Sequence, residues 1–326
     1  MLRIKAFPRI HITLIGMNRD GYRLNGGIGF SISTPVLELG FEPSKSICIE
    51  DLRKCGFTKE ELKRFKSHLE KVIQTERLDS GFRCIIHEGI IQSHVGFGSN
   101  SMVYLSCVEA LFVINKRNYN EDDVINLSGR GGTSGIGINT YFKGGYVFDA
   151  GILNRGDRQF APSSSFASMG NVKPLLLKNI KLPEWNLGIV IPQFIPKTEE
   201  EEKAFFNEKC PIEKEAVEEI MYEAVYGITT SLMENEFMTF CKSVDSLQLT
   251  KWKKLERELY GQDLIMLESI IRNAGAICVG MSSLGPLLYF FGNDVAIIVE
   301  KVKVAMPECV CFKTSFNNIG RIIEYD

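Results

Sequence analysis

The hydrophobic pattern of the first hundred residues switches between the period of a strand and that of a helix. Apolar positions alternate in "RIHITLIGM" and "GIGFSIS", which predicts two strands joined through "NRDGYRLNG", where D-G and N-G are turn signals. Thr58 and Glu61 have the spacing of a capping box and predict a helix over 59–76. The stretch "RCIIHEGI" then predicts another strand.

A glycine turn precedes the next apolar run, "SHVGFGSNSMVYLSCVEALFVIN". The run is long enough for a buried helix. A glycine turn at a helix N-terminus presents unpaired N–H groups and the positive end of the helix dipole. This stretch therefore predicts a phosphate site.

The second half of the chain has its own strands and helices. "LPEWNLGIVIPQFIP" reads as a strand bracketed by prolines, and Thr198 with Glu201 forms a second capping box. A helix restarts after Pro211, and strands predicted at 276–279 and 287–291 flank the turn "GMSSLGP". The pattern predicts a mixed α+β chain with a boundary near residue 160.

Composition narrows the class of protein. The chain has 326 residues, 44% of them hydrophobic and 24% charged, with a net charge of −2, which is typical of a soluble protein of about two domains. We expect domains at 1–160 and 161–326. The 38 basic residues are balanced by 40 acidic ones without a basic block, so we expect no nucleic-acid partner.

Neither a membrane nor a secreted location is expected. No stretch offers about 18 consecutive apolar residues, and Arg3, Lys5 and Arg9 interrupt the N-terminal apolar pattern. The nine cysteines are odd in number and irregularly spaced, with Cys309 and Cys311 on one face of a strand-like run, which favours buried reduced thiols over disulfides or a metal site. The four histidines show no zinc spacing. We expect a cytoplasmic protein, with a homodimer as the default assembly.

The segment 129–149, "GRGGTSGIGINTYFKGGYVFD", holds seven glycines and one arginine. Glycine adopts positive φ without strain and lets backbone N–H groups approach a ligand, so the segment predicts an anion cradle. A flexible linker is the alternative, but large apolar residues run through the segment, and linkers lack them.

Three glycine-hydroxyl turns, at 96–101, 129–137 and 280–285, together resemble the motifs of the GHMP kinase superfamily. Within it, "HVGFGSNS", "GRGGTSGIG", "GGYVFDAG", "PSSS", "CPI" and "GMSSLGP" resemble the β-ribofuranosylaminobenzene 5′-phosphate synthases of methanopterin biosynthesis. The resemblance implies a two-domain α+β fold, with an N-terminal ribosomal-protein-S5-like domain and a C-terminal ferredoxin-like domain.

One departure from the kinase pattern bears on function. Mevalonate-type kinases have a catalytic aspartate in S-G-x-D, seven positions before a Gly-Gly pair, whereas Gly137 stands at that position here. General-base catalysis contributes about 10²- to 10⁴-fold, so its absence argues against a kinase of this type. Because some kinases of the superfamily lack this aspartate, an ATP-dependent small-molecule kinase stays as the alternative.

The resemblance implies a decarboxylating pentosyltransferase. It joins 5-phosphoribosyl 1-pyrophosphate to 4-hydroxybenzoate or 4-aminobenzoate at ribose C1 and releases pyrophosphate and CO₂. The protein must hold charged groups, place the ring near C1 and exclude water, so we assign Arg130, Ser134 and Asp149 to the catalytic group. The expected substrate-binding residues are Arg9, His11, Arg23, Gly26, Gly27, Gly96, Gly98, Ser99, Asn100, Gly131, Gly132, Thr133, Ser282 and Ser283.

The resemblance also implies Mg²⁺, which needs only one or two carboxylates when it bridges pyrophosphate oxygens. Asp20 and Asp149 are the candidate ligands, although Asp149 reads equally as a turn residue at a strand end. His11 also reads as a half-buried strand residue, and Ser282 and Ser283 as parts of a plain turn. Ile152 stands where the synthase family has a histidine.

Overall fold

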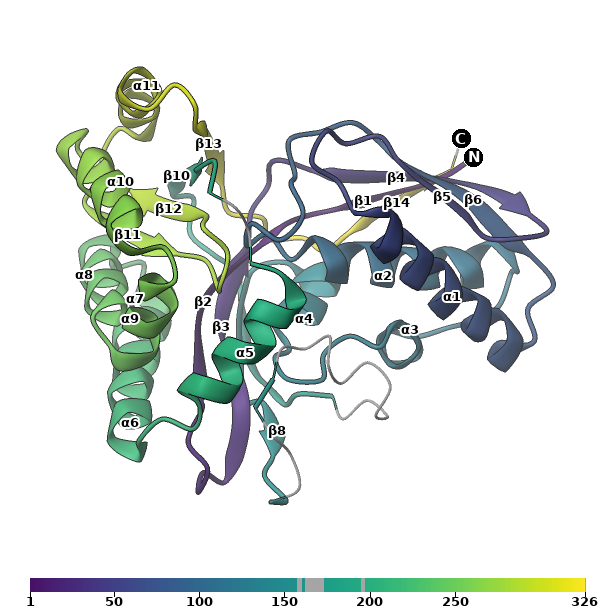
Figure 1. Cartoon of the computed structure of the whole chain (residues 1–326), viewed down its shortest axis with the longest axis horizontal. Coiled ribbons are helices and arrows are strands. Elements are labelled where there is room, and N and C mark those ends of the chain that lie inside the picture. Colours follow the sequence, from purple (N-terminus) through teal and green to yellow (C-terminus); the bar gives the residue numbers. More distant parts are fainter. Residues whose placement is uncertain (157–159, 162–172, 195–196, 326) are drawn as a thin grey trace.

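The predicted N-terminal strands form a long hairpin in the computed structural model, which describes residues 1–156, 160–161, 173–194 and 197–325. Strand β2 (Arg9–Gly16) pairs antiparallel with β3 (Arg23–Ser31), and nearly every residue of both is buried. The hairpin is extended by β7 (Tyr146–Asp149), β9 (Leu176–Ile180) and the short β8 (Ile152–Leu153), which pairs with β3. Figure 1 shows the hairpin between the two halves of the molecule.

A second sheet of the first half has the strand order β14-β1-β4-β6-β5. These strands are β1 (Leu2–Ala6), β4 (Leu37–Ser44), β5 (Cys48–Asp51), β6 (Gly81–Ile86) and β14 (Ile322–Tyr325). Four helices accompany the two sheets: α1 (Lys59–Glu76), α2 (Ser99–Ile114), α3 (Glu121–Ser128) and α4 (Ile136–Lys143). The capping box at Thr58 and Glu61 is confirmed, since both of its hydrogen bonds form at the start of α1.

Helix α2 is the central helix of this half. It is buried on most sides because it packs on β1, β4 and β6 and against α1, α3 and α4. This agrees with its almost uninterrupted apolar sequence. The N-terminus of α2, with the glycine turn before it, is thereby held in a fixed position inside the molecule.

The second half is built on an antiparallel sheet of order β11-β12-β10-β13. Its strands are β10 (Asn186–Ile191), β11 (Cys278–Met281), β12 (Leu288–Phe291) and β13 (Val310–Ser315). Its helices are α5 (Glu199–Lys209), α6 (Lys214–Tyr222), the π-helix η2 (Glu223–Thr229), α7 (Thr230–Glu234), α8 (Phe237–Gln248), α9 (Lys251–Glu258), α10 (Gly261–Asn273) and α11 (Val295–Ala305). The second predicted capping box forms at the start of α5.

The chain crosses between the halves more than once. Strands β9 and β14 follow residue 160 in sequence, yet each completes a sheet of the first half. The segment around residue 160 lies partly outside the described residues, so the exact division stays a prediction. The predicted α+β class is confirmed.

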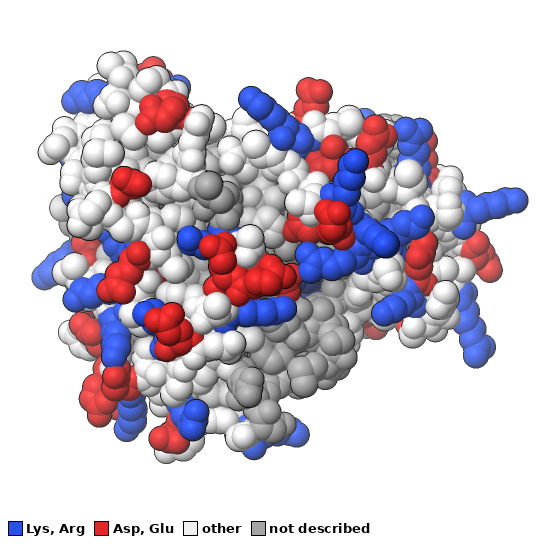
Figure 2. Space-filling view, in the orientation of Figure 1, with Lys and Arg blue, Asp and Glu red and all other residues white. Residues whose placement is uncertain are grey.

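The surface charges are mixed in sign (Figure 2) and most cysteines are buried, as the composition and the cysteine spacing predicted. Figure 2 shows basic and acidic side chains interspersed on one face, with acidic groups gathered where α5 begins in Figure 1. All nine cysteines are free, and six are buried, including Cys309 and Cys311. Among the described residues, no helix combines the length and apolarity needed to cross a membrane.

Candidate active site

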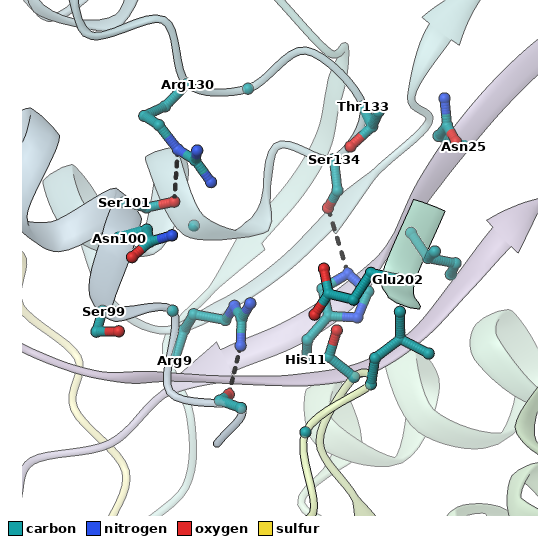
Figure 3. Close-up of a pocket in the computed structure, with 18 of the residues that line it drawn as sticks. Arg9, His11, Asn25, Ser99, Asn100, Ser101, Arg130, Thr133, Ser134 and Glu202 are labelled. Atoms are coloured by element: carbon teal, nitrogen blue, oxygen red, sulfur yellow. Dashed lines mark hydrogen bonds between the residues drawn. The ribbon is translucent and has the colours of Figure 1, made fainter. Parts of the chain in front are cut away.

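A cavity lies where the three glycine turns meet at the β2–β3 hairpin. Figure 3 shows its polar side chains converging from separate elements. The lining residues are Arg9, His11, Leu14, Asn25, His94, Gly96, Gly98, Ser99, Asn100, Ser101, Arg130, Gly131, Thr133, Ser134, Gly137, Ile138, Ala161, Glu202, Phe206, Ser283, Leu284 and Gly285.

The turn at 96–101 forms the N-terminus of α2, as predicted. Gly98 is the N-cap residue with φ +75°, and no side chain caps the first turn. The Arg9 guanidinium donates to the Gly96 carbonyl, and a Cβ on Gly98 would lie 3.1 Å from Arg9 Nε. Glycine at 98 therefore provides both the left-handed conformation and the room for Arg9. The uncapped N–H groups and the cation together form an anion site.

Arg130 approaches this turn from the other glycine segment. Its Nε donates to Ser101 Oγ at 3.2 Å, and its guanidinium carbon lies 6.0 Å from the centre of the Tyr104 ring. Burial lowers the pKa of Arg130, but an arginine stays charged in proteins. Two guanidinium groups thus enter one cavity.

A hydrogen-bonded chain runs from β2 to the end of β7. His11 Nε2 lies 3.3 Å from Ser134 Oγ, and this hydroxyl donates to Asp149 Oδ2 at 3.2 Å. The Asp149 carboxylate also accepts from the backbone N–H groups of Gly135 and Gly151. Burial raises the pKa of Asp149 to about 7, although these three donors and Arg23 oppose the rise.

His11 is neutral in this arrangement. Burial lowers its pKa well below the usual value, and the charges of Arg9 and Lys253 add to the effect. When Asp149 is ionised, the Ser134 hydroxyl gives its single proton to that carboxylate, and the ring nitrogen facing Ser134 is then the one that carries a proton. The other ring nitrogen, Nδ1, is buried and has no hydrogen-bond partner among the described residues.

The third turn closes the cavity from the second half. Ser282 Oγ donates to the Gly96 carbonyl at 2.9 Å and accepts from the backbone N–H of His11 at 3.1 Å. Ser283 adopts φ +55°, and its N–H donates to the His11 carbonyl. A Cβ on Gly285 would lie only 2.2 Å from the Val95 carbonyl carbon. Glycine at 285 lets the two turns meet backbone to backbone.

The structure brings together most of the predicted site residues. Those that line the cavity are Arg9, His11, Gly96, Gly98, Ser99, Asn100, Arg130, Gly131, Thr133, Ser134 and Ser283. Ser282 and Asp149 lie one layer behind, in contact with lining residues. Gly27 supports His11, because a Cβ there would lie 3.2 Å from His11 Nε2.

Several predicted residues lie elsewhere. Arg23 donates to the carbonyls of Ala150 and Gly151 and does not line the cavity, nor do Gly26 and Gly132. Ile152, at the position of the family histidine, is buried in β8 and does not line the cavity either.

The two predicted metal ligands are not brought together. Asp149 is opposite Gly27 in the sheet, whereas Asp20 is exposed in the hairpin turn beyond Arg23. Asp149 is buried behind Ser134, whereas Asp20 lies in an exposed turn, so the structure gives no support to a joint metal site for the two carboxylates.

Sequence reasoning missed several lining residues. Glu202 and Phe206 come from α5, His94 from the loop before the first glycine turn (96–101), and Asn25 from β3. The capping box located α5 in the sequence, but nothing in a single sequence indicates which face of that helix meets the cavity. Burial raises the pKa of Glu202 to about 7, Glu199 adds to the rise, and His94, Arg9 and Arg130 oppose it.

Comparison with solved structures defines the class of fold. The chain is similar to homoserine kinase from Cytophaga hutchinsonii, with a TM-score of 0.68 and 14% identity over 99% of this chain and 97% of that one. It is also similar to L. major mevalonate kinase, with a TM-score of 0.67 and 15% identity over 97% and 96% of the two chains. The chain thus has the fold of the GHMP kinases.

Sequence comparison identifies the family. The β-ribofuranosylphenol 5′-phosphate synthase of Methanothermobacter thermautotrophicus is 30% identical over 304 residues, 88% of each protein. The enzyme of the same name from Methanocaldococcus jannaschii is 28% identical over 98% of this chain and 99% of its own length. No protein-family model matches the chain. The chain belongs to the β-ribofuranosylphenol 5′-phosphate synthase family, as its motifs predicted.

Proposed function

We propose that the cavity binds 5-phosphoribosyl 1-pyrophosphate and 4-hydroxybenzoate or 4-aminobenzoate and joins them at ribose C1, as a step of methanopterin biosynthesis. The observation that carries this proposal is the pair of partly buried arginines at the glycine turns. Burial and then the charge of Arg130 lower the pKa of Arg9 to about 10, so the neighbouring cation disfavours the charged form of Arg9. A polyanionic ligand would relieve this repulsion.

The residues fit the steps of such a reaction. The N–H groups at the start of α2, together with Arg9 and Arg130, would hold the phosphate groups and stabilise pyrophosphate as the C1–O bond breaks. The ring carbon bearing the carboxylate would attack C1, and loss of CO₂ would restore the aromatic ring. The apolar wall, which includes Leu14, Ile138 and Leu284, would help to exclude water, the competing nucleophile.

The same cavity is poorly equipped for phosphoryl transfer. Gly137 lines it at the position of the aspartate of mevalonate-type kinases and offers no side chain. A Cβ there would lie 3.2 Å from Ser101 Oγ, so the space is occupied by the turn that we assign to phosphate binding. Asp149 is nearby, but it accepts hydrogen bonds on both of its oxygens. The ATP-dependent kinase is therefore the weaker alternative.

Magnesium would be held mainly by the substrate. The described residues contain no group of three or more His, Cys, Asp or Glu that could hold a metal ion. Asn100 Oδ1, beside the glycine turn, is buried and has no hydrogen-bond partner among the described residues, so it is free to contact a hydrated ion. Bound Mg²⁺ would supply charge neutralisation of the pyrophosphate.

The test measures release of labelled CO₂ from carboxyl-labelled 4-hydroxybenzoate with Mg²⁺ and 5-phosphoribosyl 1-pyrophosphate, with ATP in parallel. We expect CO₂ and pyrophosphate in equal amounts with the ribosyl donor and none with ATP. In a thermal-shift assay, a donor at about 100 times its Kd should add about 2.7 kcal/mol of stability. Stabilisation by ATP alone, without CO₂ release, would refute the proposal in favour of a kinase.

Arg130→Ala is the variant that ties this activity to the cavity. Hydrogen bonds to charged groups contribute about 1.5–3 kcal/mol, so we expect the KM for the ribosyl donor to rise roughly 10- to 100-fold. Arg117→Ala is the matched control, because Arg117 is exposed and does not line the cavity. Equal kinetic effects of the two substitutions would contradict the assigned site.

A further inference from the structure

Glu202 differs from the three glutamates that precede it on α5. Glu199 pairs with Arg64 of α1, Glu201 closes the capping box with Thr198, and Glu200 is exposed. The Glu202 carboxylate has no hydrogen-bond or ion-pair partner among the residues that the structure describes, and Figure 3 shows it pointing into the cavity. This half-buried carboxylate is therefore available to contact a ligand in the cavity.

The position of α5 is fixed at both ends. Its first turn is held to α1 through the Arg64–Glu199 ion pair, and the rings of Phe205 and Phe206 pack on Trp252 of α9. Glu202 therefore projects into the cavity from a rigid support.

The wall around Glu202 suits an aromatic ring. Phe206 follows Glu202 by one helical turn and lies on the same face of α5. Leu14 and Leu284 also line the cavity, whereas the glycine turn and the arginines form its phosphate-binding part. A benzoate ring packed on Phe206 would place its polar substituents within reach of a carboxylate.

Burial and the surrounding charges together place the pKa of Glu202 near neutral pH. Burial is the main reason that its pKa lies near 7, and Glu199 raises it further. His94, itself paired with Glu61, and the two arginines oppose this rise. A carboxyl group with this environment suits a general base, whose pKa is best near the working pH.

The other polar groups near the cavity are less suited to receive a proton. When Asp149 is ionised, the His11 nitrogen that faces Ser134 already carries a proton, and its other nitrogen is buried. Asp149 lies behind Ser134 and is engaged by three donors. Glu202 is the carboxylate that both lines the described cavity and lacks a partner.

We infer that Glu202 accepts the 4-hydroxyl proton of 4-hydroxybenzoate as the new carbon–carbon bond forms and returns it after CO₂ leaves. The phenolic O–H bond breaks as the ring carbon bonds to C1 and the C1–O bond to pyrophosphate breaks. This gives a dienone that still carries the carboxylate. Loss of CO₂ returns the electron pair to the ring oxygen, which takes the proton back from Glu202. No oxidant, reductant or further reactant is needed.

This inference rests on the proposed function and makes a distinct prediction. An amino group donates its lone pair without first losing a proton, so 4-aminobenzoate does not require the base. Glu202 is therefore a determinant of reactivity toward the phenol specifically.

The experiment compares Glu202→Gln with Glu200→Gln on both benzoates. We expect Glu202→Gln to lower kcat/KM for 4-hydroxybenzoate roughly 10²- to 10⁴-fold and to change that for 4-aminobenzoate less than about 3-fold. The wild-type rate with 4-hydroxybenzoate should rise with pH through about 7, and this rise should be absent in the glutamine variant. Glu202→Asp, which keeps a carboxylate, should recover part of the rate, and Glu200→Gln should behave as wild type.

Equal losses of kcat/KM with both benzoates would overturn the inference. It would also be overturned if Glu202→Gln kept the wild-type rise in rate through pH 7 with 4-hydroxybenzoate. A raised Mg²⁺ requirement with both substrates would reassign Glu202 as a metal ligand. These outcomes leave the proposed function intact, because the wild-type protein would still release CO₂. Wild-type protein inactive on both benzoates would refute the proposed function itself.

Discussion

The buried ion pair on α9 allows a quantitative test of the packing between helix α9 and the third glycine turn. Lys253 and Glu256 are 0% and 1% exposed. Lys253 Nζ donates to Glu256 Oε2 at 2.6 Å and to the Met281 carbonyl at 2.8 Å. Glu256 also accepts from Trp252 Nε1 at 2.8 Å. The pair thus joins α9 to Met281 in the third glycine turn.

Lys253→Met should leave the buried Glu256 carboxylate without its cationic partner. Removing one partner of a buried ion pair destabilises a protein by about 3–5 kcal/mol, and the Met281 carbonyl also loses its donor. Lys253→Met/Glu256→Gln removes the stranded charge while the glutamine oxygen still accepts from Trp252. We therefore expect the double variant to recover at least half of the loss.

Urea unfolding followed by tryptophan fluorescence measures these free energies, since the chain has two tryptophans and one of them, Trp252, belongs to the network. Lys254→Met is the matched control on the same helix, because Lys254 is exposed, and its effect should stay within about 0.5 kcal/mol. A loss of less than about 1 kcal/mol for Lys253→Met, or a double variant no more stable than the single one, would contradict a buried, energetically coupled ion pair.

Three further predictions concern the site and the thiols. Burial gives Asp149 a folded-state pKa of about 7 against an ordinary 3.8, so its contribution to stability is present below about pH 4 and is lost as the pH rises through 7. The free energy of unfolding should fall by up to about 4 kcal/mol over that range, and Asp149→Asn should remove most of this pH dependence. An unchanged pH dependence in Asp149→Asn would contradict the raised pKa of Asp149. Gly285→Ala should lower both the Tm and the affinity for the ribosyl donor, because a Cβ there collides with backbone, whereas Gly89→Ala, with open space around it, should do neither. A thiol reagent should rapidly modify the exposed Cys48 and Cys55 in the native protein and all nine cysteines after unfolding. Modification of the six buried cysteines without unfolding would contradict the structure.

The local features of the fold were predictable because their signals are local. Each capping box at Thr58 and Thr198 depends on two residues three positions apart, and each forms as predicted. The glycine turns were equally predictable, because Gly98 and Gly131 adopt positive φ, a conformation that glycine reaches without strain. The sequence also predicted that both Arg9 and Arg130 bind substrate, Arg130 from its glycine turn and Arg9 from its position in the N-terminal strand.

The rest of the site depends on tertiary packing that leaves no local trace. Glu202 enters the cavity because α5 is held between α1 and α9, and its neighbours in sequence are also glutamates. Arg23 and Asp20 are close to the glycine turn of β3 in sequence, yet Arg23 donates to the Ala150 and Gly151 carbonyls and Asp20 lies in an exposed turn, so neither lines the cavity. Proximity in sequence was a poor guide here because tertiary contacts decide where each side chain points.

The return of β9 and β14 to the sheets of the first half restricts how this protein can be cut or recombined. A fragment that ends at residue 160 would lack both strands and leave an unpaired edge on β1 and on β7. Exposed edges of this kind promote aggregation. A chimera of two relatives joined at that point would have to match edge strands inherited from different parents. Gene exchange within the family should therefore succeed at crossover points that keep β14 with β1, and β9 with β7, from the same parent.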